Sequence, residues 1–546
     1  VPVSALVEAP TRIVSKEGVQ GFEEADAEAT LKRCRAKIKA TVEANGHGYL
    51  RKSALKNWTP EEVAEARGLE WRRKINDRLH PEVSGNKSLP TVNRLLAEIA
   101  VTLADDDSLL TNARVEIRKG GQGLEIWMNT LRPINERWRE APIVMLDATA
   151  NAEITAIIAG QELAHHAKIS AKENVEVLQT TDLTGAKSHF FGRGKPTGNV
   201  ARMSHWIRLQ AMNQERTAVI SNKSIIEALD LPDSMAKAHF NALRGLNDMQ
   251  NVDHLIVIGR TQPADIQIGR YVAALWGTPV QGALQPNGCV ERVELGPDGH
   301  GRIMSRSGTT HSCPRGQAVL GMIRDNEVIQ AIGRLRGVNR ETPVTVTLVS
   351  DAVVPYPTTP VQLKPDIWSA GILGPMLDRG VAFLSPSQAA KAYPDLFASR
   401  QAADKVLARL SDRATFPIEV LYGKSCAVVG IKTTRSQNTT KALVAPWVED
   451  AQAEIEKHLL NAKVVSVQMP QERAWTSLGR ITLTAAATRA AALADPDGVA
   501  RTSEAIEAFW DWVELLAQQN ASPTLECKTD YEHRNPYYPT GPKAVR

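Results

Sequence analysis

One stretch of the sequence gathers side chains that could bind phosphate. Residues 330–340 read QAIGRLRGVNR and hold three arginines. A guanidinium group is planar and always charged, so it can bind phosphate oxygens through two parallel hydrogen bonds. Apolar residues recur at helical spacing through this stretch, at Val328, Ala331, Ile332 and Leu335. The pattern predicts a helix over 330–340 that is anchored in a core, with the arginines near its edge. It also fits an ordinary amphipathic helix with a solvated basic face.

A second stretch has an acidic residue after an apolar run. Residues 142–146 (PIVML) predict a short buried strand, and Asp147 and Thr149 follow it. In α/β proteins, sites form where strands end. Asp147 could therefore bind magnesium, which would require a phosphate loop.

Two further strands end in polar residues. The apolar run Thr217–Ile220 is followed by Ser221 and Asn222, and Arg244, Gly245 and Asn247 precede the apolar run His254–Gly259. Short polar side chains and a glycine allow a phosphate backbone to approach closely.

The elements that must position these residues alternate between strand and helix from about residue 141 to 350. Further strands are predicted at Val175–Gln179 and Val344–Val349, and helices at Ala152–His166 and Gln267–Leu275. This alternation predicts an α/β fold with a doubly wound parallel sheet.

The flanking regions differ from this pattern. Residues 1–140 predict a basic helical segment, a helix at Leu89–Ala104 and a β-hairpin at Ala113–Met128. Residues 351–546 begin with a proline-rich linker at 355–365 and predict an α/β accessory domain with a flexible tail. Its predicted elements are helices at 387–390, 402–410, 446–459 and 503–518 and a strand pair at 418–421 and 427–431.

Composition excludes some classes of function. The 546 residues carry a net charge of +4, and no apolar run approaches the roughly 20 residues of a membrane helix. Five scattered cysteines without a C-x-x-C pair, and no evident signal peptide, predict a cytoplasmic protein without membrane partners. The spacing of Cys289, His300, His311 and Cys313 fits no usual zinc pattern, so we expect no metal site there.

Taken together, these motifs resemble those of superfamily 2 helicases. Gln330-x-x-Gly333-Arg334-x-Arg336 resembles the sixth helicase motif. The segment with Asp147 and Thr149 resembles the third, Ser221 and Asn222 resemble the fourth, and Arg244, Gly245 and Asn247 resemble the fifth. The resemblance covers residues 141–350, which would form the second RecA-like lobe, with residues 1–140 completing a first lobe.

The resemblance implies the C-terminal portion of an ATP-dependent DNA helicase of the phage or plasmid replication type. It assigns nucleotide contacts to Gln330, Gly333 and Arg334, and transition-state stabilisation to Arg334, Arg336 or Arg340. The relatives commonly have an arginine at the position of Gly337. Asp147 and Thr149 would couple nucleotide to DNA, and Ser221, Asn222, Arg244, Gly245 and Asn247 would bind single-stranded or forked DNA.

One expected part is missing from the sequence. Gly423-Lys424-Ser425 and Gly192-Arg193-Gly194-Lys195 resemble a phosphate loop but lack its spacing. ATP and Mg²⁺ would therefore be bound mainly by a remaining helicase lobe, and other replication proteins are possible partners. The alternatives are a non-catalytic nucleic-acid-binding module without the phosphate loop and a scaffold that recruits a replication partner.

Overall fold

The structure is a computed structural model, which describes residues 2–4, 22–72, 89–121, 123–131, 134, 144–147, 149–167, 173–212, 216–243, 245, 249–296, 299–413, 426–433 and 438–468. The chain divides into two compact units. The first comprises residues 1–168, 263–285 and 311–322, and the second comprises residues 169–262, 286–310 and 323–546. No helix in the described ranges combines the length and apolarity needed to cross a bilayer.

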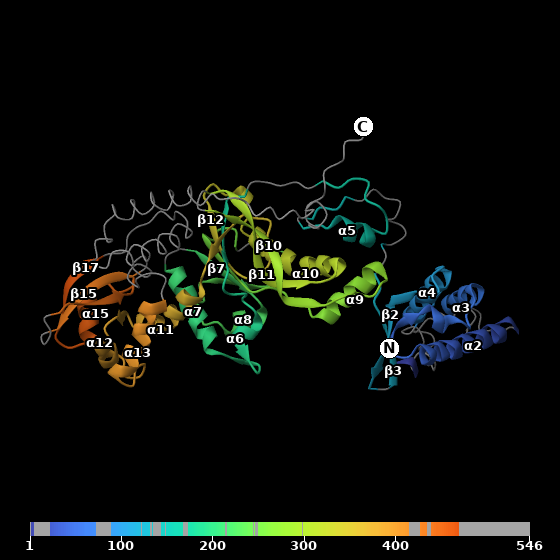
Figure 1. Ribbon diagram of the computed structural model, residues 1–546, viewed down its shortest axis with the longest axis horizontal. Helices are drawn as coiled ribbons and strands as arrows, with labels where there is room; N and C mark the ends of the chain where they lie inside the picture. Colours follow the sequence, from blue (N-terminus) through green and yellow to red (C-terminus); the bar gives the residue numbers. More distant parts are fainter. Residues whose placement is uncertain are drawn as a thin grey trace, which may run out of the picture. The chain divides into compact units, whose positions relative to one another are not determined.

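The first unit contains a three-stranded antiparallel sheet with helices packed against it (Figure 1). Its strands are β1 (Gly48–Arg51), β2 (Thr111–Gly120) and β3 (Gly123–Met128). Its helices are α2 (Phe22–Asn45), η1 (Lys52–Leu55), α3 (Pro60–Arg72), α4 (Leu89–Ala104), α5 (Ala152–Ala159) and α9 (Asp265–Trp276). Helix α4 shows how the sequence forms this core, because its apolar positions 92, 95, 96 and 99 fall on one face and are all buried.

An eight-stranded sheet forms the centre of the second unit. The strand order is β11-β10-β13-β4-β12-β9-β7-β8, and every neighbouring pair from β10 to β8 is parallel. The strands are β4 (Val175–Thr180), β7 (Thr217–Ser221), β8 (Ala236–His239), β9 (His254–Ile258), β10 (Leu284–Leu295), β11 (Gly301–His311), β12 (Val344–Val349) and β13 (Thr358–Val361).

The central strands are buried on both faces. Along β9, Leu255 and Val257 belong to one core and Ile256 and Ile258 to the other. This alternation is what a parallel sheet covered on both sides requires. The elements around it are α6 (Lys187–Phe190), a hairpin of β5 (Phe191–Gly192) and β6 (Lys195–Pro196), α7 (Gly198–Ala211), α8 (Lys223–Ala228), α10 (Pro314–Gly333) and η4 (Gly337–Asn339).

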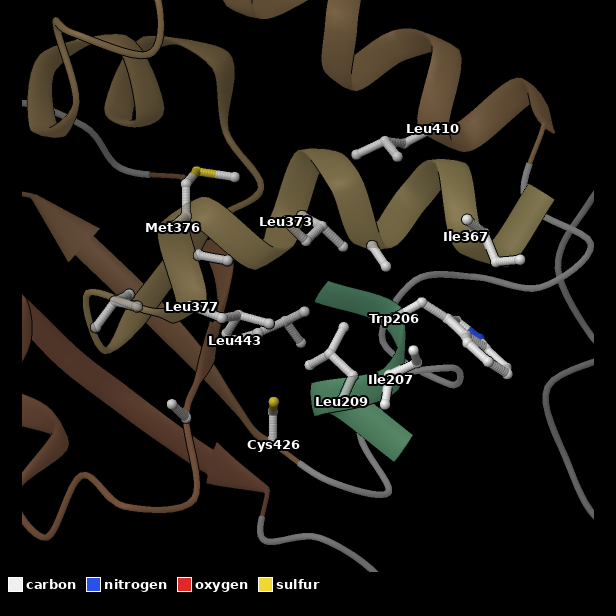
Figure 2. Packing of buried hydrophobic residues seen from close by; sticks show 14 of the residues in the cluster. Trp206, Ile207, Leu209, Ile367, Leu373, Met376, Leu377, Leu410, Cys426 and Leu443 are labelled. Atoms are coloured by element: carbon white, nitrogen blue, oxygen red, sulfur yellow. The ribbon is translucent and has the colours of Figure 1, made fainter. Parts of the chain in front are cut away.

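A smaller antiparallel sheet follows in the same unit. Its order is β14-β16-β15-β17. The elements are α11 (Lys364–Leu377), β14 (Val381–Phe383), α12 (Pro386–Ala392), α13 (Arg400–Arg413), β15 (Ala427–Thr433), β16 (Thr440–Val444), α15 (Ala451–His458) and β17 (Ala462–Gln468). Figure 2 shows side chains of α7 and α11, among them Leu209 and Leu373, close to Leu443 of β16. One core therefore joins the two sheets.

Much of the predicted secondary structure is confirmed. The predicted strands at 175–179, 217–220, 254–259 and 344–349 correspond to β4, β7, β9 and β12. The predicted helices at 89–104 and 267–275 correspond to α4 and α9, and the hairpin at 113–128 to β2 and β3. The mixed α/β class with a large, mostly parallel sheet is also confirmed.

Three predictions about element positions are wrong. Of the predicted strand at 142–146, the structure describes residues 144–146. They lie outside any helix or strand, and Leu146 is 94% exposed. The supposed linker at 355–365 contains β13, which enters the large sheet between β10 and β4. The predicted helix over 330–340 ends at Gly333, so all three of its arginines follow the helix instead of lying on it.

Two predicted helices are shorter because of their caps. Helix α5 ends at Ala159, since Gly160 adopts a left-handed conformation with φ of 68°. Helix α15 begins after Asp450, whose carboxylate accepts a hydrogen bond from the Ala453 backbone, and not at Pro446. The predicted strand at 418–421, the helix at 503–518 and the C-terminal tail lie outside the described residues.

Candidate functional site

A pocket of about 820 Å³ lies at the carboxyl ends of β7, β8 and β9. Parallel strands place the segments that follow them at one edge of the sheet, and ligands bind there in many α/β proteins. The lining residues come from these segments and from the start of α6: Ala186, Lys187, Ser188, Asn222, Lys223, Ser224, Glu227, Phe240, Asn241, Arg260 and Gln262. Three cationic side chains and one carboxylate belong to this lining. Arg260 is ion-paired with Asp351, and Lys223 Nζ lies 3.8 Å from Glu227, so the excess positive charge is that of Lys187.

The two predicted residues after β7 have different environments. Ser221 is fully buried, and its hydroxyl donates to the Ile258 carbonyl at 2.8 Å. It therefore joins β7 to β9 and is not available to a ligand. Asn222 lines the pocket, and its amide donates to the Arg260 carbonyl at 3.3 Å. Of this predicted pair, only the second side chain lies where a ligand could reach it.

Arg260 was not predicted from the sequence, although it occupies the centre of this edge. It is 8% exposed, and its Nε lies 2.7 Å from Oδ1 of Asp351, which follows β12. Its guanidinium also donates to the Thr309 hydroxyl at 3.0 Å and to the Thr184 carbonyl at 3.1 Å. Burial lowers the pKa of Arg260, and Asp351 opposes this shift. The signal that could have found it is Gly259-Arg260 directly after an apolar strand.

Arg324 and Asp325 form a second buried ion pair close to the pair of Arg260 and Asp351. Arg324 and Asp325 of α10 form two hydrogen bonds, at 2.6 and 3.0 Å, and Asp325 also accepts from the Val353 backbone at 3.1 Å. Asp351 is linked to the same region because it accepts from the Thr309 backbone at 3.0 Å. Burial raises the pKa of Asp325. These contacts fix the position of Arg260 relative to α10 and β11.

The predicted arginine segment lies at the opposite edge of the sheet. It connects the end of α10 to the start of β12, and the Asn174 side chain, just before β4, donates to the carbonyls of Arg340 and Glu341 at 3.2 and 2.9 Å. Gly337 is buried, and its carbonyl accepts from the Asn174 backbone at 3.0 Å. A strand of six residues spans roughly 20 Å. The arginine segment and the pocket are therefore separate surfaces of one sheet.

The three arginines of this segment are not equivalent. Arg340 donates to the Val252 carbonyl at 2.7 Å and to the Leu335 carbonyl at 3.3 Å, so its guanidinium fastens the loop. Arg336 is exposed and has a left-handed backbone with φ of 51°. Arg334 is half-buried, and its Nε is enclosed without a hydrogen-bond partner. Gln330 and Gly333 lie in the last turn of α10 beside it.

The remaining predicted residues that the structure describes are Asp147, Thr149 and Gly245. Asp147 is exposed and accepts hydrogen bonds from the Thr149 backbone and hydroxyl at 2.8 and 3.0 Å, which closes a local turn in the first unit. Gly245 is exposed with φ of 80°, whereas Arg244 and Asn247 lie outside the described residues.

The two segments that resemble a phosphate loop give no phosphate site in the described part of the chain. Gly192 and Lys195 belong to the β5–β6 hairpin, whose two-residue turn has Arg193 and Gly194 at positive φ. Residues 423–425 lie outside the described residues. Within the described ranges, no group of three or more histidine, cysteine or acidic side chains could hold a metal ion.

Comparisons with protein-family models, curated proteins and solved structures gave no match to this chain.

Proposed function

We propose that this chain is the C-terminal part of an ATP-dependent superfamily 2 DNA helicase, with the large sheet as its second, RecA-like lobe. The observation that carries the proposal is the separation of two cationic surfaces on one parallel sheet. The pocket at the carboxyl edge would bind the DNA backbone, and the arginine segment at the amino edge would approach a nucleotide.

The chemistry of the pocket supports a phosphate backbone as its ligand. Lys187 supplies the excess positive charge, Lys223 adds an exposed cation 3.8 Å from Glu227, and the amides of Asn222 and Asn241 supply hydrogen-bond donors. Most contacts to DNA in protein complexes go to phosphate and sugar, from these kinds of side chain.

Arg334 is the arginine best placed to act on a nucleotide. Its half-buried guanidinium has an unpartnered Nε, whereas the guanidinium of Arg340 is used within the fold. Hydrolysis of ATP with Mg²⁺ would supply the energy for movement along DNA, and Arg334 would stabilise negative charge on the phosphoryl group. The phosphates themselves would be held mainly by the remaining helicase lobe.

A second candidate is a nucleic-acid-binding module without ATPase activity. It is favoured by the β5–β6 hairpin, because Gly192–Lys195 forms a tight turn and not a phosphate-binding loop. Both candidates share the DNA-binding pocket and differ in the role of Arg334.

The shared claim can be tested by titrating the purified chain into a fluorescently labelled single-stranded oligonucleotide at several salt concentrations. We expect affinity to fall steeply, and linearly on logarithmic axes, between roughly 50 and 200 mM salt, because phosphate contacts release counterions. An affinity that does not change with salt would contradict the proposal.

A further inference from the structure

Two arginines approach one exposed tryptophan in the first unit. Trp127 of β3 is 40% exposed. The guanidinium carbon of Arg118, on β2, lies 5.0 Å from its ring centroid, and that of Arg270, on α9, lies 4.9 Å from it. These three residues, which we call the Trp127 cluster, bring a sheet and a helix distant in sequence onto one surface.

The ring is held in a defined orientation. Its indole N–H donates to Oε2 of Glu125 at 3.2 Å. Glu116 is the cross-strand neighbour of Trp127 and also forms an ion pair with Arg118. The two carboxylates therefore fix the ring edge and one guanidinium, and a substantial part of the indole stays in contact with solvent.

The charge of Arg270 is not neutralised in the same way. No carboxylate among the described residues forms an ion pair with it, and its Nε is enclosed without a hydrogen-bond partner. Stacking on an indole stabilises a guanidinium by roughly 0.5–1 kcal/mol at an exposed site. It does not use the terminal N–H groups of the guanidinium, which can donate to an anion, whereas the enclosed Nε cannot. Tyr271, next to it on α9, is also exposed.

We propose that the Trp127 cluster binds one unpaired base of single-stranded DNA, with Arg270 on the adjoining phosphate. An exposed aromatic ring with neighbouring arginines is the arrangement that binds bases of any sequence, since every base has a π-face. This inference rests on the proposed DNA-binding function, and it adds a contact to bases that the phosphate-binding pocket does not provide.

The test compares two labelled probes by fluorescence anisotropy, an oligothymidylate and an abasic strand of the same length. The wild-type chain is expected to bind the oligothymidylate more tightly. Trp127→Ala is expected to weaken its binding about 5- to 150-fold, the range for one stacked base, and to leave abasic binding unchanged. Trp127→Phe is expected to restore part of the loss, and Arg270→Gln to weaken binding of both probes.

Trp447→Ala is the matched control, because Trp447 is exposed and lies near the smaller sheet of the second unit. Thermal melting of each variant reports whether it is folded. Equal affinity of the wild-type chain for both probes, or an equal loss of both on Trp127→Ala, would overturn the inference while the phosphate-binding proposal stands. Binding of neither probe by the wild-type chain would overturn both proposals.

Discussion

Arg334 and Arg340 lie six residues apart, but the structure gives their side chains different environments. The guanidinium of Arg340 donates hydrogen bonds to the carbonyls of Val252 and Leu335, whereas the Nε of Arg334 has no hydrogen-bond partner. An arginine-rich sequence alone cannot separate these cases, because a guanidinium that fastens a loop and one that binds phosphate are the same residue type.

This difference gives a prediction for paired variants. We expect Arg340→Ala to lower the free energy of unfolding by about 1–3 kcal/mol, because backbone carbonyls lose their donor. We expect Arg334→Ala to change it by about 0.5 kcal/mol or less. If the proposed helicase function holds, Arg334→Ala is expected to reduce ATP turnover on the order of 10³-fold once the lobe that would hold the phosphates is present.

Urea unfolding of both variants and ATPase assays on the complete enzyme check this prediction. Arg334→Lys should restore little turnover, since a point charge cannot reproduce the planar contact. Normal turnover of Arg334→Ala would contradict the nucleotide role and favour the binding module.

His254 gives a prediction for pH. It is fully buried at the start of β9, its Nε2 lies 2.8 Å from the Thr347 hydroxyl, and burial lowers its pKa to about 4. The unfolded state, with a pKa near 6.5, binds the proton more readily than the folded state. Stability is therefore present above about pH 6.5 and is lost as pH falls towards 4, by up to about 3 kcal/mol.

Urea unfolding between these pH values tests the role of His254. His254→Gln is expected to flatten the dependence over this window even if the variant is less stable throughout, because glutamine does not titrate. His47→Gln, at an exposed site, is the control. An unchanged pH dependence in His254→Gln would exclude His254 as its source.

At the scale of elements, the connection between α10 and β12 depends on one glycine. A Cβ at Gly337 would lie 2.4 Å from the Val175 side chain and 3.2 Å from Glu173. A Cβ at Gly333 would meet no atom within 4 Å outside its own helix and chain neighbours. Gly337 is therefore required by packing, which explains why an arginine cannot occupy this position here.

We expect Gly337→Ala to lower the free energy of unfolding by about 1–3 kcal/mol, because the β-branched Val175 cannot move aside without strain. Gly333→Ala is the matched control and should melt within a few degrees of the unmodified chain. Similar melting temperatures for both variants would contradict the close approach of this loop to β4.

The elements that could be predicted are those with strong local patterns. The strands β7, β9 and β12 are short apolar runs, and α4 has a clear apolar face. Strand β13 could not be predicted, because Pro360 lies within it and prolines surround it. Val144–Leu146 has the composition of a buried strand but stays exposed, since burial depends on tertiary partners.

The candidate site was predictable only in part for the same reason. Asn222 and the arginine segment stand out as polar residues beside apolar runs. Arg260, Lys187 and Asn241 join the pocket because distant segments meet at one edge of the sheet. Only the strand order, which the sequence does not state, brings them together.

At the scale of the whole molecule, the proposed function places the DNA backbone at the carboxyl edge of the large sheet. The most direct measurement is the salt dependence of single-stranded DNA binding by Lys187→Ala/Lys223→Ala beside the control Lys391→Ala/Lys405→Ala. Lys187 and Lys223 line the pocket, whereas Lys391 and Lys405 are exposed on α12 and α13 and lie outside the lining. Both variants remove two positive charges, so the control accounts for the change in net charge.

If each pocket lysine contacts one phosphate, the logarithmic salt slope should decrease in magnitude by about 1.4 in the pocket variant and stay unchanged in the control. Equal slopes for the unmodified chain and the pocket variant would contradict the claim that this pocket binds DNA.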